Sequence, residues 1–187
     1  GDENYQPMFL PIDGGIPEAI FGERFAGQQV LCQHCDPENF IATFTVDPRR
    51  SPEHESFRAN LQSGELLSMG VSHYGNFVGA VNDDVTQAIL SDSYTMGDAV
   101  LFLWNEATAT RQPLYGTPID ERSQEGSYPL TGFGASELTA QGGLLLTTVL
   151  YDDHYSLGYI QLAKAQAMQP VKVVGIRHTG NGEMEQI

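Results

Sequence analysis

Met96-Gly-Asp-Ala-Val-Leu-Phe-Leu-Trp104 is the longest unbroken apolar run in the chain that is flanked by turn-forming residues. Gly97-Asp98 precedes its apolar part, and Asn105-Glu106 follows it. The run is too short for a membrane span, which needs about 20 apolar residues. Apolar and polar side chains do not alternate in it, so no face of the predicted strand is left for water. The stretch therefore predicts a strand buried on both faces, such as a central sandwich strand.

The composition suits a single β-rich domain over residues 1–187, since 41% of the residues are hydrophobic and can form a core. There are 9 Lys and Arg against 24 Asp and Glu, for a formal net charge of -15. A field of this sign repels phosphate backbones and anionic lipid surfaces, so we expect neither nucleic-acid binding nor membrane insertion. Cationic partners and divalent ions remain candidates.

The first two residues, Gly1-Asp2, also bear on where the protein acts. A leading glycine without methionine is typical of a scar left by a cleaved tag, with a leader removed before Asp2. On this reading we expect a periplasmic or secreted protein rather than a cytoplasmic one.

Short segments rich in β-branched and aromatic residues lie between turn residues, which is the pattern of β-strands. The predicted strands cover residues 28–31, 39–46, 66–71, 76–81, 144–150, 155–162 and 171–176. The pair 66–71 and 76–81 is expected to form a hairpin around His73-Tyr-Gly-Asn76. The proline-rich residues 1–27 predict an extended arm, because residues before proline avoid the helical region.

Two segments carry helix signals. Ser51-Pro52 combines a favoured N-cap with a favoured first helical residue, Phe57 and Leu61 are spaced four apart, and Gly64 provides a stop. Asp83 or Asp84 could cap a second, short helix, with a strand as the alternative. A further helical turn is expected before Pro170.

Strands outnumber helices in this reading, and the two do not alternate regularly, which argues against a parallel sheet with crossover helices. We therefore expect a mainly β fold, an antiparallel barrel or sandwich with one or two short helices packed on it. An α+β fold is the alternative.

Residues 105–143 form a long polar stretch with many prolines and glycines, and we predict a functional loop there. Its aromatic residues offer contact area at low entropic cost, so they are candidates for ligand binding. Alternatively, they pin the loop to its own domain. The candidate binding residues are Trp104 before the loop, Tyr115, Tyr128 and Phe133 within it, and His73 and Tyr74 of the hairpin.

Cys32-Gln-His-Cys35 resembles the Cys-x-His-Cys active site of thioredoxin-like disulfide oxidoreductases, and Gly116-Thr-Pro118 resembles the Gly-Thr-Pro turn that carries their cis-proline. The resemblance covers seven residues. It implies a redox dithiol at a helix N-terminus, where the dipole stabilises the thiolate.

The same cysteines could bind zinc with His34 or His54, although a structural zinc site needs four ligands. Two cysteines without a second pair instead favour a local disulfide or two free thiols beside a strand. Asp152, Asp153 and His154 form another candidate metal or base cluster, with an ordinary solvated turn as the alternative.

No P-loop, dinucleotide fingerprint or His-Glu-x-x-His motif is present, so no cofactor is predicted. Our first hypothesis is a non-enzymatic β-rich module that binds an unknown small molecule or protein. The alternative is a thiol-disulfide or metal-dependent enzyme that uses the cysteine pair or the cluster at residues 152–154. A homo-oligomer built through exposed strand edges is the third possibility.

Overall fold

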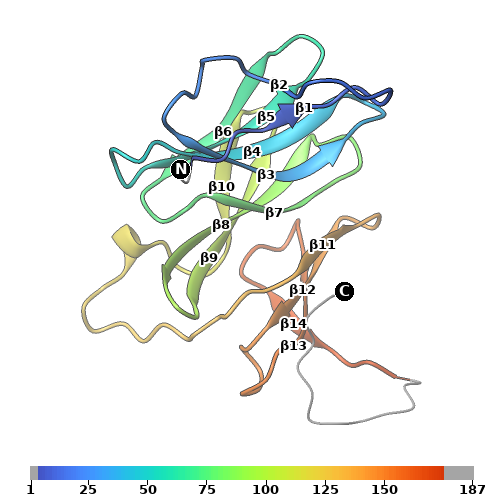
Figure 1. Ribbon diagram of the computed structural model, residues 1–187. Helices are drawn as coiled ribbons and strands as arrows, with labels where there is room; N and C mark the ends of the chain where they lie inside the picture. Colours follow the sequence, from blue (N-terminus) through green and yellow to red (C-terminus); the bar gives the residue numbers. More distant parts are fainter. Residues whose placement is uncertain (1–3, 175–187) are drawn as a thin grey trace.

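The computed structural model describes residues 4–174 as three four-stranded antiparallel sheets that follow one another along the chain (Figure 1). The first contains β3 (Gln29–Asp36), β4 (Ile41–Asp47), β5 (His54–Asn60) and β6 (Leu66–Ser72). The second contains β7 (Phe77–Val81), β8 (Gln87–Thr95), β9 (Asp98–Asn105) and β10 (Thr110–Tyr115). The third contains β11 (Ser136–Thr139), β12 (Gly143–Thr148), β13 (Ser156–Gln161) and β14 (Met168–Val171).

Each sheet is a simple meander, since the order of its strands in space follows their order in the chain. The first strands of the sheets lie toward one another, because β7 contacts both β3 and β11. The prediction of a mainly antiparallel β fold is confirmed, but the sheets do not close into a barrel.

The second sheet is sandwiched between the other two, which explains the apolar run that ends at Trp104. Val100, Phe102 and Trp104 of β9 point into a core shared with Met69 of the first sheet. Leu101 points the other way, into a core shared with the third sheet. Both faces of β9 are therefore buried, as predicted.

The apolar runs that end at Trp104 and at Leu150 both suit buried strands, which predicts that they lie side by side in a single antiparallel core. β9 and β12 instead belong to different sheets and meet face to face through the core around Leu101, Leu144 and Leu146.

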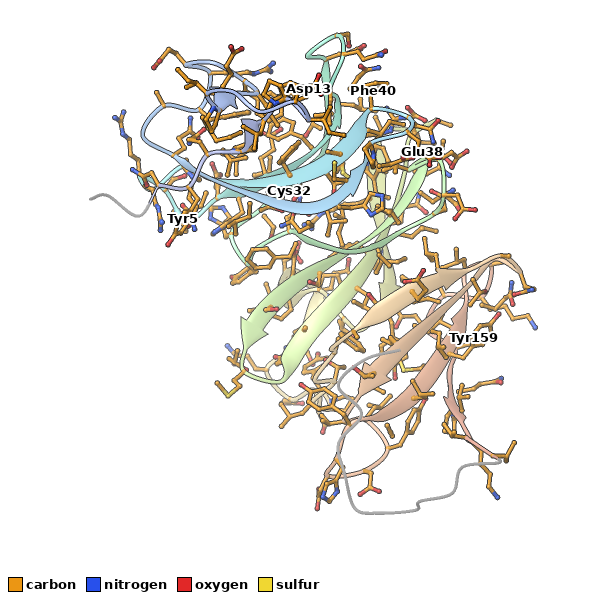
Figure 2. The ribbon with its side chains drawn as sticks, turned by 45° about the vertical axis from the view of Figure 1, so that its right-hand side comes forward. Tyr5, Asp13, Cys32, Glu38, Phe40 and Tyr159 are labelled. Carbon is orange, nitrogen blue, oxygen red and sulfur yellow. The ribbon has the colours of Figure 1, made fainter. Side chains whose placement is uncertain are left out.

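The N-terminal arm covers the outer face of the first sheet. A small hairpin of β1 (Met8–Phe9) and β2 (Glu18–Ala19) lies in the arm. Phe21 and Phe25, which follow it, pack on Phe44 of β4. Figure 2 shows this arm over the first sheet, far from Tyr159 on the third.

The predicted helix after Ser51-Pro52 is wrong, because this segment forms β5. Phe57 pairs with Phe44 across the sheet and Ala59 with Ala42, so the apolar side chains find their partners in β4. Residues four apart, such as Phe57 and Leu61, lie on the same face of a strand as well as of a helix. Pairing with β4 therefore favoured the strand over the helix.

The other helix expectations also fail within residues 4–174, where the structure contains no α-helix. Residues 82–86 form a turn before β8, in which Val85 has a positive φ of 53°. Residues 162–167 form turns before β14. β14 includes Pro170, which a strand at the edge of a sheet tolerates. The expected strand 171–176 is thus shifted toward the N-terminus, and residues 175 and 176 lie outside the described residues.

The predicted hairpin around His73 is also wrong. Both strands exist, but β6 pairs with β5 and β7 pairs with β8. The segment 73–76 therefore connects two sheets. The predicted loop 105–143 contains β10 and β11, and only residues 116–135 connect the second sheet to the third. This connection holds one turn of 3-10 helix, η1 (Ile119–Glu121).

None of the described residues form a helix with the length and apolar character that would let it cross a bilayer.

Candidate binding groove at the sheet connections

A groove of about 510 Å³ lies where the connection between the first two sheets meets the connection between the last two. We refer to it as the groove. Residues 71–74, strands β8 to β10 and residues 118–121 line it. The lining residues are Val71, Ser72, His73, Tyr74, Asp92, Tyr94, Phe102, Arg111, Pro113, Pro118, Ile119, Asp120 and Glu121.

The local sequence turns the chain sharply at one wall of the groove. Gly75 and Asn76 both have positive φ, 115° and 52°, which glycine and asparagine tolerate better than other residues. The Ser72 hydroxyl accepts a hydrogen bond from the Tyr74 backbone N–H at 3.0 Å. The Tyr74 carbonyl accepts one from the Ser93 N–H at 2.8 Å. These two bonds hold the Tyr74 backbone beside β8.

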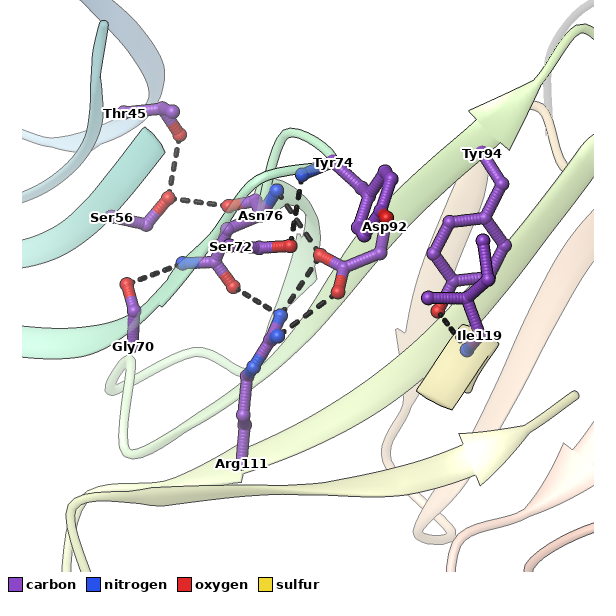
Figure 3. Close-up of polar contacts among 10 residues, drawn as sticks. All are labelled: Thr45, Ser56, Gly70, Ser72, Tyr74, Asn76, Asp92, Tyr94, Arg111 and Ile119. Carbon is purple, nitrogen blue, oxygen red and sulfur yellow. Dashed lines mark hydrogen bonds and ion pairs between the residues drawn. The ribbon is translucent and has the colours of Figure 1, made fainter. Parts of the chain in front are cut away.

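A buried ion pair forms the floor of the groove (Figure 3). The Arg111 guanidinium donates two hydrogen bonds to the Asp92 carboxylate, each 2.9 Å long, and a third to Asn76 Oδ1 at 2.6 Å. It also lies 4.1 Å from the centre of the Phe102 ring. Asp92 and Asn76 are buried, so every polar contact here works in a region with little water.

Asn76 extends this network into the first sheet. The side-chain NH₂ of Asn76 donates a hydrogen bond to the Gly70 carbonyl at 2.6 Å. The backbone carbonyl of Asn76 accepts a hydrogen bond from the Ser56 hydroxyl. The Ser56 hydroxyl is hydrogen-bonded in turn to that of Thr45, at 2.7 Å. The floor is therefore joined to β4 and β5 by hydrogen bonds as well as by packing, which makes it a rigid platform.

Two tyrosines form the upper wall. The rings of Tyr74 and Tyr94 meet edge to face, with centroids 4.7 Å apart. The Tyr94 hydroxyl accepts a hydrogen bond from the Ile119 N–H at 3.1 Å and so fixes the start of η1 (Figure 3). Burial raises the pKa of Tyr94, and the nearby negative charges of Asp92 and Asp120 raise it further.

Arg122 fastens the 116–135 connection next to the groove. Its guanidinium lies between the rings of Tyr94 and Tyr128, 4.8 and 4.7 Å from their centres. It also donates two hydrogen bonds to Asp98, of 2.6 and 2.8 Å. Tyr115 and Phe133 meet edge to face at 6.0 Å. Tyr115, Tyr128 and Phe133 therefore contact other residues of the chain, and Tyr115 and Tyr128 also line a separate cavity beside Arg122.

The Asp98–Arg122 contact makes part of the stability depend on pH. Hydrogen bonding to Arg122 holds the pKa of Asp98 below its ordinary value of about 3.9. A carboxyl whose pKa is lowered on folding stabilises the protein above its unfolded pKa and loses that contribution as the pH falls through the folded value. We expect Asp98→Asn to flatten the decline of the urea midpoint below about pH 4. An unchanged decline would contradict this role.

The structure separates the remaining predicted binding residues. His73 and Tyr74 both line the groove, and His73 lies 3.5 Å from Glu53 at the surface. Trp104 has 0% of its surface exposed and lies in the core between the first and second sheets, out of reach of a ligand in this structure.

The cysteine motif lies in strand β3, and no described helix begins there. A bulge between Cys32 and His34 brings Cys32 opposite Phe44 and Cys35 opposite Ala42. Both thiols are free and exposed. Partial burial raises the pKa of the Cys32 thiol, and the nearby Cys35 adds to this effect. Residues 4–174 also contain no cis peptide bond, so Pro118 does not have the cis geometry that the thioredoxin-like resemblance implies.

The candidate metal ligands do not converge within the described part of the chain, which contains no group of three or more His, Cys, Asp or Glu side chains suited to a metal ion. His34 lines a different cavity, together with Gln33 and Glu137. His54 lies against the Phe77 ring. Thiol titration and metal analysis of the purified protein still test the enzyme hypothesis.

Asp152, Asp153 and His154 lie in an exposed turn between β12 and β13. His154 Nδ1 is 3.9 Å from Asp152 Oδ1, and the Asp153 N–H donates to the same carboxylate at 2.8 Å. The contacts are those of a solvated turn.

Sequence reasoning missed the residues that build the floor and wall of the groove, namely Asp92, Arg111 and Tyr94. One signal was present for Arg111, because the chain has only 9 Lys and Arg residues and each of them is therefore conspicuous. Its partners Asp92 and Asn76 are 19 and 35 residues away, and nothing local connects them.

No family model matches this chain, and neither does any curated protein. Solved structures match its fold. A luciferin-regenerating enzyme is 14% identical over 89% of this chain and 55% of its own, with a TM-score of 0.51. A chain of a nidogen–laminin complex is 14% identical over 86% and 54%, with a TM-score of 0.50. TolB from Acinetobacter baumannii is 12% identical over 89% and 49%, with a TM-score of 0.45.

These identities show similarity of fold alone, to β-propeller-like proteins built from successive antiparallel sheets. The chain spans about half the length of each of these structures.

Proposed function

We propose that this chain is a non-enzymatic binding module that takes a segment of a protein partner into the groove. The observation that carries the proposal is the combination of an open aromatic wall with a rigid floor. Tyr74 keeps 38% of its surface exposed, although it is anchored by hydrogen bonds on both sides. Tyrosine held in this way is typical of protein-binding surfaces, because a large ring binds with little loss of conformational entropy.

The shape of the groove favours a chain segment over a compact small molecule. It is partly open to solvent, and its walls come from three separate parts of the chain. Pro113 and Pro118 line it beside the tyrosines, and rigid apolar surfaces of this kind pack well against an extended peptide. One of the similar folds belongs to a protein found in a complex with another protein, nidogen with laminin, which is compatible with this role.

The test is a selection of displayed random peptides on the intact protein, followed by calorimetric titration of the enriched peptides. We expect Tyr74→Ala to weaken their binding by about tenfold or more, because the ring forms the exposed part of the wall. Tyr151→Ala is the matched control, since Tyr151 is 37% exposed but lies in the turn after β12. Equal losses in the two variants, or no enriched peptide at all, would overturn the proposal.

Two further expectations concern where the protein acts and how it assembles. Export from the cytoplasm and assembly into a homo-oligomer both remain predictions, and light scattering on the purified protein addresses the second.

A further inference from the structure

Two clusters with the same arrangement border the groove. Each contains an arginine that binds a carboxylate and lies over an aromatic ring. In the floor, Arg111 pairs with Asp92 and stacks on Phe102. Beside the wall, Arg122 pairs with Asp98 and stacks on Tyr94 and Tyr128. The planar guanidinium suits both contacts at once, because its edge binds a carboxylate while its face covers a ring.

A third cluster in the groove has the ring and the carboxylates but lacks the arginine. Tyr74 is partly exposed, and Asp120 and Glu121 line the same groove. Neither carboxylate forms an ion pair with another residue of the described chain, whereas Asp92 and Asp98 both do. His73, the remaining titratable group at this end, faces Glu53.

The electrostatics of the site favour a cation. Three carboxylates, those of Asp92, Asp120 and Glu121, line the groove. Arg111, which lines the groove, already binds Asp92 and Asn76. The whole chain carries a formal charge of -15, so a cationic partner is attracted from a distance as well.

We propose that the groove recognises an arginine side chain of the protein partner, with its guanidinium stacked on Tyr74 and bound by Asp120 and Glu121. This inference rests on the function proposed above and names the chemistry of the partner. Arginine is favoured over lysine because an ammonium group cannot stack and form a two-pronged ion pair at the same time.

The test is an NMR titration of the intact protein with three blocked pentapeptides. Each has the sequence Gly-Gly-Xaa-Gly-Gly, where Xaa is arginine, lysine or citrulline, so that shape and charge are varied separately. We expect the arginine peptide to shift the amide signals of Tyr74 and Asp120. It should bind several-fold more tightly than the lysine peptide and about tenfold more tightly than the uncharged citrulline peptide. Equal affinities for all three would overturn the inference.

A pair of variants separates this contact from general attraction to an acidic protein. Asp120→Asn with Glu121→Gln should weaken arginine-peptide binding by about fivefold to tenfold. The control is Glu38→Gln with Glu125→Gln, which changes the net charge by the same amount at exposed carboxylates that do not line the groove. Equal effects of the two double variants would contradict the inference.

The outcomes also separate the two proposals. If selected peptides depend on Tyr74 but contain no arginine, and their binding ignores Asp120 and Glu121, the groove binds protein segments and the arginine inference is wrong. If no peptide binding depends on Tyr74, the proposed function fails first.

Discussion

Arg111→Met is expected to lower the free energy of unfolding by about 3–5 kcal/mol, because it leaves the buried carboxylate of Asp92 without its cation. Asp92 has 4% of its side chain exposed and Arg111 19%, so water can replace the lost contacts only in part. Asn76 Oδ1 loses a hydrogen-bond donor as well. Since this network joins the first two sheets, the loss should affect global unfolding and not only the groove.

Urea unfolding followed by the fluorescence of the single tryptophan, Trp104, measures this change. Arg111→Lys is a second informative variant, since it keeps the charge but cannot form the two-pronged contact. It should lower the free energy of unfolding by less than Arg111→Met does. Arg49→Met is the matched control, because Arg49 pairs with Asp47 near the surface, with 38% of its side chain exposed. Exposed pairs contribute about 1 kcal/mol or less. If Arg111→Met lowered the free energy of unfolding no more than Arg49→Met, the floor would not join the first two sheets as we infer.

Trp104→Ala is expected to cost about 3–5 kcal/mol, the range for truncating a fully buried aromatic side chain. Trp104 is among the largest side chains with no exposed surface, and it packs with Met69, Ala88 and Phe102 between the first two sheets. Strands on both sides of this core would lose contacts, and β9 cannot move to fill the space because its other face packs on the third sheet.

Circular dichroism must follow this unfolding, since the variant has no tryptophan. Trp104→Phe should lower the free energy of unfolding by less than Trp104→Ala, for two reasons. It keeps most of the volume, and it removes the indole N–H, a buried donor without an acceptor among residues 4–174. Leu103→Ala, at the neighbouring half-buried position, is the control. A loss for Trp104→Ala no greater than for Leu103→Ala would show that this core does not hold the first two sheets together.

Strands with one dominant signal were predictable. The predicted segments overlap β4, β9, β12 and β13. Runs of apolar and β-branched residues that end in turn residues strongly favour strands over other structures. In β9 the missing alternation itself reported that both faces are buried, since a strand with one wet face must alternate.

The segment after Ser51-Pro52 shows where local signals fail. Its caps and spacing fit a helix, but pairing of Phe57 with Phe44 and of Ala59 with Ala42 outweighs them. Helix propensities and caps each contribute about 1 kcal/mol or less, whereas a strand in the middle of a sheet gains a ladder of hydrogen bonds and a buried face.

The candidate site was only partly predictable for the same reason. His73 and Tyr74 attracted attention as polar and aromatic residues at a turn, and both line the groove. The Cys32–Cys35 motif drew more attention, but the strand around it gives it no helix N-terminus. Arg111, Asp92 and Asn76 form one network although they come from three different strands or turns.

By itself, the sequence determined that the chain is acidic, rich in antiparallel strands and built around an apolar segment covered on both sides, because charge and side-chain periodicity are local properties. Only the tertiary structure decided that β3 to β14 divide into three four-stranded sheets and that Tyr74 and Asp120 line the same groove. Those outcomes depend on pairing and packing between residues far apart in the chain, and these interactions form only when the sheets pack together.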